Sequence, residues 1–246
     1  MGRSRHGAEG RGDELSAVKQ DMCQLIYHLS HDLRNPLVNM HALLNDMKSM
    51  LAEAEAGRPA VLKKEMPETV KLFEQTVDRM SEIINGTNDI YHCMFDEPEC
   101  EAVDMQELVE RVLNRFESRL SNIDVSLGLL PDIRADPLAL ARIVEQLIDN
   151  AVESMSPAGG KLALAVESGD DSETLVVSDS GCGIYKDNLE QIFLPFYTTR
   201  EGAFGMGLAV VKALTESHGG RAWCESESGN GATFYATFPV PPAKSA

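Results

Sequence analysis

Residues 29–37 read Leu-Ser-His-Asp-Leu-Arg-Asn-Pro-Leu, which places a histidine, an acid and an amide within one short stretch. An apolar repeat with alternating steps of three and four residues surrounds this stretch and predicts a long helix over residues 13–51. The repeat consists of Leu15, Val18, Met22, Leu25, Leu29, Pro36, Met40, Leu43, Met47 and Met50. His31 lies off this row and is expected to face solvent, whereas Asp32 lies on it. Pro36 has no N–H for the Asp32 carbonyl, so we expect the helix to bend there.

Three interpretations of His31 compete: an ordinary exposed helical histidine, a metal ligand and a nucleophile. A metal site is disfavoured because His28 and His31 have no third ligand at helical spacing except Asp32, which points to another face. A nucleophile needs a base beside the imidazole and a phosphoryl donor elsewhere in the chain. Asp32 supplies the base, so the choice depends on what the C-terminal half contains.

Composition narrows the class of protein. The chain has 246 residues, 43% of them hydrophobic, and a formal net charge of −17. This charge disfavours nucleic acid and anionic membranes as partners. No apolar run approaches the roughly 18 residues of a membrane span, so no direct span is expected. Five cysteines are scattered without a CxxC pair, which favours a cytoplasmic protein with free thiols.

Breaks in the pattern predict the domain layout. We expect a disordered leader at 1–12, a helical hairpin at 13–97, a linker at 98–103, an α+β domain at 104–240 and a tail at 241–246. Gly57-Arg58-Pro59 is a breaker, and Met66-Pro67-Glu68 is expected to start the second helix.

The second helix of the hairpin carries an apolar stripe that is wider than one partner helix can cover. The stripe consists of Val70, Phe73, Val77, Met80, Ile84, Thr87, Tyr91 and Met94, widened by Ile83 and Ile90. Two hairpins packed as a four-helix bundle would bury it, so we expect a homodimer. The alternative, in which the hairpin packs on its own C-terminal domain, is less favoured.

The second half changes from helical periodicity to mixed helices and strands, which predicts an α+β sandwich with helices on one sheet face. Asp136-Pro137 is expected to cap a helix that carries Asn150. The other expected helices cover residues 104–120, 188–193 and 206–218, and the expected strands cover residues 123–129, 161–167, 174–179, 221–225 and 233–238.

Three short motifs in this half suggest nucleotide chemistry, although each has a plainer explanation. Asn150 is either an oxygen ligand for Mg²⁺ or a packing amide. Asp179, at a strand end before two glycines, either accepts the amino hydrogens of adenine or belongs to a turn. Gly205-Met206-Gly207 opens a helix, where free backbone N–H groups suit phosphates.

Taken together, these motifs resemble a known family. The residues around His31 closely resemble the phosphoacceptor box of sensor histidine kinases. The second half resembles the ATPase superfamily shared by histidine kinases, gyrase, Hsp90 and MutL. Asn150 matches the N box, Asp179-x-Gly181-x-Gly183 the G1 box, residues 192–196 the F box and Gly205-Met206-Gly207-Leu208 the G2 box. Residues 150–155 and 195–200 look most like the nitrogen-regulator-type subgroup, whereas Glu153 and Ala203 depart from the commoner pattern.

The resemblance implies a site for ATP and Mg²⁺. Its expected nucleotide contacts are Asn150, Asp179, Gly181, Gly183, Thr199, Arg200, Gly205, Gly207 and Leu208, with Asn150 as the metal ligand. Arg200 would act as the cation for the γ-phosphate. Gln146 occupies the position where hydrolysing members of the superfamily carry a glutamate, and an amide cannot act as a base.

The resemblance also implies the reaction, which is transfer of the γ-phosphoryl group to His31 with Asp32 orienting the ring proton. The group would then pass to an aspartate in the receiver domain of a response regulator. Asn35 is expected either to hold a water for the reverse dephosphorylation or merely to cap the bend.

Two other functions remain open. One is a phosphotransfer scaffold with a non-catalytic nucleotide domain, and the other is a serine kinase of the anti-sigma type. Because no sensor is recognisable in the sequence, we expect the signal to come from a missing segment or a separate protein.

Overall fold

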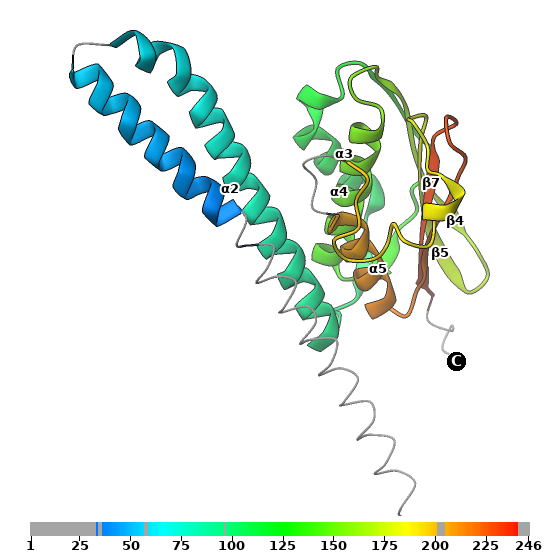
Figure 1. Ribbon diagram of the computed structural model, residues 1–246. Helices are drawn as coiled ribbons and strands as arrows, with labels where there is room; N and C mark the ends of the chain where they lie inside the picture. Colours follow the sequence, from blue (N-terminus) through cyan, green and yellow to red (C-terminus); the bar gives the residue numbers. More distant parts are fainter. Residues whose placement is uncertain (1–32, 34–35, 57–58, 96, 201–204, 241–246) are drawn as a thin grey trace, which may run out of the picture. The chain divides into compact units, whose positions relative to one another are not determined.

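The computed structural model describes all residues except 1–32, 34–35, 57–58, 96, 201–204 and 241–246 (Figure 1). The chain forms two compact units, Met1–Ile84 and Asn85–Ala246. The boundary falls inside helix α2 (Pro59–Phe95), so this helix contributes to both units. Among the described residues, none of the helices is long and apolar enough to cross a membrane.

The first unit contains a helical hairpin. A helix at residues 36–55 and the first part of α2 lie side by side in Figure 1. Their less exposed residues repeat at steps of three and four. On the first helix these are Met40, Leu43, Met47 and Met50, and on α2 they are Thr69, Phe73, Thr76 and Met80. The predicted seam of the first helix is therefore confirmed over the part that the structure describes.

Each helix of the hairpin also carries a second apolar row, which is exposed. Leu37, Leu44 and Leu51 follow one another at seven-residue spacing on the first helix, and Val70, Val77 and Ile84 do so on α2. These side chains are 38–52% exposed. The single stripe predicted for the second helix is thus two rows, since Phe73 and Met80 are half-buried.

The predicted start of the second helix at residues 66–68 is wrong. Helix α2 begins at Pro59 and continues through Pro67. Pro59 suits the first position of a helix because its missing N–H has no helical partner there. The residues between the two prolines are mostly good helix formers, so Pro67 falls inside the helix and does not start it.

The second unit contains a five-stranded sheet in the order β2-β4-β5-β7-β6, with β2 and β4 parallel and the other pairs antiparallel. Its strands are β2 (Ile123–Leu127), β4 (Gly160–Ser168), β5 (Ser172–Asp179), β6 (Ala222–Ser226) and β7 (Ala232–Pro239). Helices α3 (Met105–Arg115), α4 (Pro137–Ser154) and α5 (Gly207–Ser217) cover one face of the sheet (Figure 1). The predicted α+β sandwich is confirmed.

Smaller elements complete this unit. Strands β1 (Glu101–Val103) and β3 (Ile133–Ala135) form a separate antiparallel pair, and two short 3₁₀ helices lie at Glu117–Arg119 and Lys186–Asn188. The sequence did not predict β1 or β3, because three residues are too few to show alternation. Strand β1 lies in the segment that was expected to be a linker.

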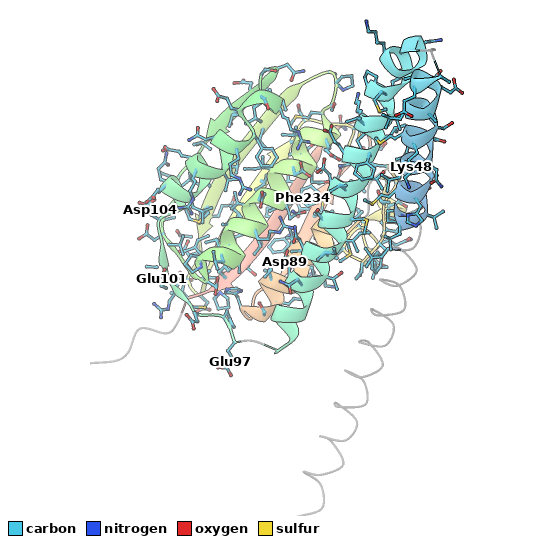
Figure 2. All side chains as sticks on the ribbon, turned by 90° about the vertical axis from the view of Figure 1, so that its left-hand side faces the viewer. Lys48, Asp89, Glu97, Glu101, Asp104 and Phe234 are labelled. Carbon is cyan, nitrogen blue, oxygen red and sulfur yellow. The ribbon has the colours of Figure 1, made fainter. Side chains whose placement is uncertain are left out.

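The core lies between the sheet and the three helices. Strand β7 buries Ala232, Phe234, Ala236 and Phe238, while the residues between them face the other side. Phe234 is seen among the side chains of this core in Figure 2. At the start of α4, the Asp136 carboxylate accepts hydrogen bonds from the backbone N–H groups of Leu138 and Ala139. The predicted Asp136-Pro137 cap is therefore confirmed.

The last turns of α2 pack within the second unit. Asp89, labelled in Figure 2, forms an ion pair with Arg142 of α4, with 2.9 Å between Oδ2 and Nε. Arg142 also bonds Glu145, at 3.2 Å. Both partners of the Asp89–Arg142 pair are largely buried, so the end of α2 is tied to the surface of α4.

His218 links the end of α5 to the start of α4. Its Nε2 accepts the backbone N–H of Asp136 at 3.0 Å, and its Nδ1 lies 2.7 Å from the carbonyl oxygen of Leu214. This pattern fixes the neutral tautomer in which Nδ1–H donates to Leu214. The ring also packs edge-on against Phe238.

We expect His218→Ala to lower the free energy of unfolding by about 1–3 kcal/mol, because it leaves the Asp136 N–H without its partner. Urea unfolding followed by circular dichroism measures this change. The exposed His41 provides a matched control, and His41→Ala should change the free energy by less than about 0.5 kcal/mol. Equal effects of the two substitutions would contradict the structural role of His218.

Candidate functional site

Helix α4 presents polar side chains along the face that does not enter the core. Gln146, Asn150 and Ser154 follow one another at four-residue spacing, so they lie on one side of the helix. A Cβ added to Gly207, the first residue of α5, would clash with Oε1 of Gln146. The start of α5 therefore lies close against the Gln146 side chain of α4, which would have to move if residue 207 carried a Cβ.

Asp179 ends strand β5 close to the end of α4. Its side chain is 6% exposed. Oδ1 accepts hydrogen bonds from the backbone N–H of Gly181 and from the hydroxyl of Ser154, each at 2.8 Å. Oδ2 is buried and has no hydrogen-bond partner among the described residues. A buried acceptor without a partner costs free energy unless a ligand satisfies it.

Burial raises the pKa of the Asp179 carboxyl above its ordinary value. The Gly181 N–H, the Ser154 hydroxyl, the Ala232 backbone and the positive charge of Arg200 each lower this pKa and offset part of the shift. The hydrogen bonds from Gly181 and Ser154 both go to Oδ1, and Oδ2 is left without a partner among the described residues. This arrangement suits a ligand that donates a hydrogen bond to the other oxygen.

Arg200 lies against the same helix face. Its Nη2 donates to Oδ1 of Asn150 at 2.6 Å and to the Asn150 carbonyl at 3.3 Å. Its Nη1 pairs with Glu153 at 2.7 Å. Glu153 also pairs with Arg119, at 3.7 Å. The amide oxygen that was predicted to bind a metal thus faces a guanidinium in this structure.

The start of α5 completes the candidate site. Gly205 has a φ of +67°. Met206 occupies the N-cap position of α5, and its side chain makes no capping hydrogen bond. The N-cap side chain thus takes up none of the N–H groups of the first turn, and helix ends of this kind can bind phosphates. Leu208 packs against the core, and Thr199 is exposed near Arg200.

The structure brings together most of the residues that were predicted for the second half. Asn150, Asp179, Arg200 and Gly207 all lie around the polar face of α4, and Gly183 (φ +66°) follows Asp179 in the same loop. The three residues predicted to carry the reaction, His31, Asp32 and Asn35, lie outside the described residues, as do residues 201–204 of the predicted lid.

The sequence did not single out Ser154 as a site residue. Its four-residue spacing from Asn150 was the available signal, because this spacing places both residues on one helix face. The bond from Ser154 to Asp179 joins residues 25 positions apart. Such a contact becomes visible only when α4 and β5 are packed together.

A cavity of about 440 Å³ lies elsewhere, beyond the end of α4. It is lined by Arg119, Asn122, Ile123, Val152, Glu153, Met155, Ser156 and Pro157. None of the predicted nucleotide contacts lines it. We therefore place the candidate site at Asp179 and the start of α5, and not in this cavity.

Asn150 fits a magnesium ion in one respect. Its Oδ1 is the hard oxygen ligand that Mg²⁺ prefers, and the ion usually takes few protein ligands beside phosphate oxygens and water. No group of three or more His, Cys, Asp or Glu side chains that could hold a metal occurs among the described residues. A metal at Asn150 would therefore depend on the phosphates of a nucleotide.

Comparison with known proteins shows what the chain is similar to. Residues 135–242 match the model of the histidine kinase-, DNA gyrase B- and HSP90-like ATPase family. The adaptive-response sensory kinase SasA of Synechococcus elongatus is 30% identical over 242 residues, which cover 92% of this chain and 61% of SasA. The sensor histidine kinase ZraS of Escherichia coli K12 is 31% identical over 218 residues, which cover 86% of this chain and 44% of ZraS.

Among solved structures, the histidine kinase ThkA in complex with the response regulator protein TrrA is similar in fold. The match has a TM-score of 0.68 and 24% identity, and it covers 96% of this chain and 65% of that chain. The chain spans less than two thirds of the length of SasA or ZraS. The narrower resemblance to the nitrogen-regulator subgroup stays a prediction.

The two cysteines nearest the site should differ in reactivity. Burial raises the pKa of the Cys224 thiol to about 12, so it is almost fully protonated at neutral pH and should not react with iodoacetamide. Cys182 is exposed in the loop after Asp179. We expect iodoacetamide to label Cys182, and Mg·ADP to slow this labelling if the loop binds nucleotide. Peptide mass spectrometry measures both rates, and labelling of Cys182 that ADP does not slow would place the nucleotide elsewhere.

Proposed function

We propose that this chain, which belongs to the sensor histidine kinase family, uses ATP to phosphorylate His31. The observation that carries the proposal is the Asp179 carboxylate, with one oxygen satisfied and the other buried without a partner among the described residues. Adenine has an exocyclic amino group that can donate to such an oxygen. The proposed layout is a phosphoacceptor hairpin at 13–97 and a nucleotide-binding domain at 104–240.

The phosphates would lie at the start of α5. The N–H groups of its first turn carry the partial positive charge of the helix dipole. Gly207 permits the close approach between α5 and Gln146. Gln146 has no basic group, so it would not activate water beside the γ-phosphate. ATP would thus persist until a nucleophile reaches it.

Asn150 and Arg200 would share the charge of the triphosphate. Arg200 donates to Oδ1 of Asn150 in this structure, and a guanidinium and Mg²⁺ at the same oxygen would repel each other. We infer that Arg200 leaves Asn150 when Mg·ATP binds and turns to the γ-phosphate. Mg²⁺ would neutralise charge between the phosphates, which phosphoryl transfer requires.

The transfer forms a bond between a ring nitrogen of His31 and the γ-phosphorus. The bond from that phosphorus to the β,γ-bridging oxygen breaks, and ADP leaves. Asp32 would orient or accept the proton on the other ring nitrogen, which keeps electron density at the attacking nitrogen. The phosphoryl group would then pass to an aspartate of a response regulator. The role of Asn35 in the reverse dephosphorylation stays a prediction.

The proposed function predicts separate losses in two variants. His31→Gln should abolish labelling by γ-labelled ATP while leaving ADP affinity unchanged, because the phosphoacceptor lies outside the nucleotide site. Asp179→Asn should weaken ADP binding about ten-fold or more. The substitution replaces one of the two acceptor oxygens with an NH₂ group, which donates hydrogen bonds and would face the amino group of adenine. Autoradiography and isothermal titration calorimetry measure the two effects.

The chemistry of the label separates the other functions. A phosphohistidine is labile in acid and stable in alkali, so acid-stable label would indicate a serine kinase. A chain that neither binds ADP nor takes up label would be a phosphotransfer scaffold. Label that survives in His31→Gln would place the acceptor at another residue.

We also propose that the chain is a homodimer through its hairpin. The rows Leu37/Leu44/Leu51 and Val70/Val77/Ile84 are exposed in the single chain and follow heptad spacing. Heptad spacing is the pattern of helices that pack side by side in bundles. A second hairpin would cover both rows and complete a four-helix bundle.

The double variant Val77→Glu/Ile84→Glu should be monomeric, because each substitution would bury a charge in the bundle at a cost of several kcal/mol. Light scattering at micromolar concentration measures the mass. Gln75→Glu, an exposed position on another face of α2, serves as the control and should stay dimeric. A wild-type chain that is monomeric at this concentration would contradict the proposal.

A further inference from the structure

Ser154 is the last residue of α4, and its hydroxyl faces the carboxylate of Asp179. Oγ lies 2.8 Å from Oδ1 of Asp179 and 2.8 Å from the carbonyl oxygen of Ala151. The hydroxyl has one hydrogen, so it can donate fully to only one of these acceptors at a time. A charged carboxylate is the stronger acceptor, and the hydrogen is expected on that side.

The end of α4 and the loop after β5 lie so close together that the Asp179 carboxylate has little room to rotate. A Cβ added to Gly181 would clash with Oγ of Ser154, so the loop after β5 lies directly on the end of α4. Gly181 donates its N–H to the same Oδ1 that Ser154 bonds. Two donors therefore hold one oxygen and fix the plane of the carboxylate, while Oδ2 remains free for a ligand.

We propose that Ser154 is the positioning residue for base recognition: its hydroxyl fixes the Asp179 carboxylate with Oδ2 turned to an amino group, and so favours adenine over guanine. This inference rests on the proposed function, because it assumes that the base lies at Asp179. Ser154 acts through Asp179 and need not touch the nucleotide.

The selection follows from donors and acceptors. Adenine presents an amino group at its six position, which donates to an ionised oxygen. Guanine presents a carbonyl oxygen there, which an ionised oxygen repels and a protonated carboxyl can bond. Any change that favours the protonated form of Asp179 therefore weakens the binding of adenine and strengthens the binding of guanine.

The charge balance at Asp179 supports this role. Burial raises the pKa of this carboxyl, and Ser154 is one of the groups that lower it. The Gly181 and Ala232 backbones and Arg200 are the others. Removing the hydroxyl should raise the pKa further, so protonation would begin at a higher pH. Below that pH adenine affinity is lost, and above it the affinity is retained.

The test is calorimetric titration of the full chain with Mg·ADP and Mg·GDP at a series of pH values below neutrality. For Ser154→Ala we expect ADP to bind about ten-fold more weakly, GDP to bind no more weakly, and the midpoint of the pH dependence to move up. Ser156→Ala is the matched control, because Ser156 is exposed and lies two residues further along the chain, beyond the end of α4. It should leave both affinities and the midpoint unchanged.

Two further variants separate positioning from folding. Ser154→Thr keeps the hydroxyl and should restore the wild-type midpoint. Ser154→Cys keeps the size but donates weakly, and it should behave like Ser154→Ala. A Ser154→Ala variant that binds ADP with an unchanged midpoint and an unchanged preference over GDP would overturn the inference. Loss of folding in both Ser154→Ala and Ser154→Cys would overturn it as well, because the role of Ser154 would then be structural.

Failure of the proposed function looks different. If the base did not lie at Asp179, the wild-type chain would bind no ADP, or Asp179→Asn would bind it as well as wild type does. If ADP binds and Asp179→Asn weakens it, the proposed site stands, and only the comparison of Ser154→Ala with Ser156→Ala decides the role of Ser154.

Discussion

The burial of one face of α4 is the constraint on which the second unit depends. Ile143, Leu147 and Ile148 are fully buried against the sheet, which fixes the rotation of the helix about its axis. The flank of the helix beside this buried face must then present Gln146, Asn150 and Ser154 together. A rotation by one residue, about 100°, would bury these polar groups without partners and expose the core. Packing and chemistry are thus set by the same contacts.

Much of the fold was predictable because its signals are local. Alternation along β7 and the Asp136-Pro137 cap depend on neighbouring residues, and both are found as expected. The start of α2 was misplaced because two prolines, Pro59 and Pro67, both suit a helix start, and the choice depends on packing. Strands β1 and β3 form only by pairing with each other. The sequence of either three-residue segment alone does not indicate a strand.

The sequence indicated which residues belong to the candidate site, but not which partners their side chains bond. Asp179 and Asn150 stood out because an acid at a strand end and an amide on an amphipathic helix call for partners. What they bond could not be inferred, since the bonds from Asn150 to Arg200 and from Asp179 to Ser154 span long stretches of chain. Ser154 had no distinguishing feature in the sequence, because a serine at the end of a helix is common.

The pairing of Arg200 with Glu153 has a consequence for ionic strength. Both side chains are substantially exposed, 37% and 41%, so salt screens their attraction. In the proposed function Arg200 leaves Asn150 and turns to the γ-phosphate. If it also leaves Glu153, it loses one anionic partner as it gains another. Screening weakens both partnerships, and the two effects offset each other. Nucleotide affinity in this chain should therefore depend less on salt than the charge of a triphosphate alone suggests.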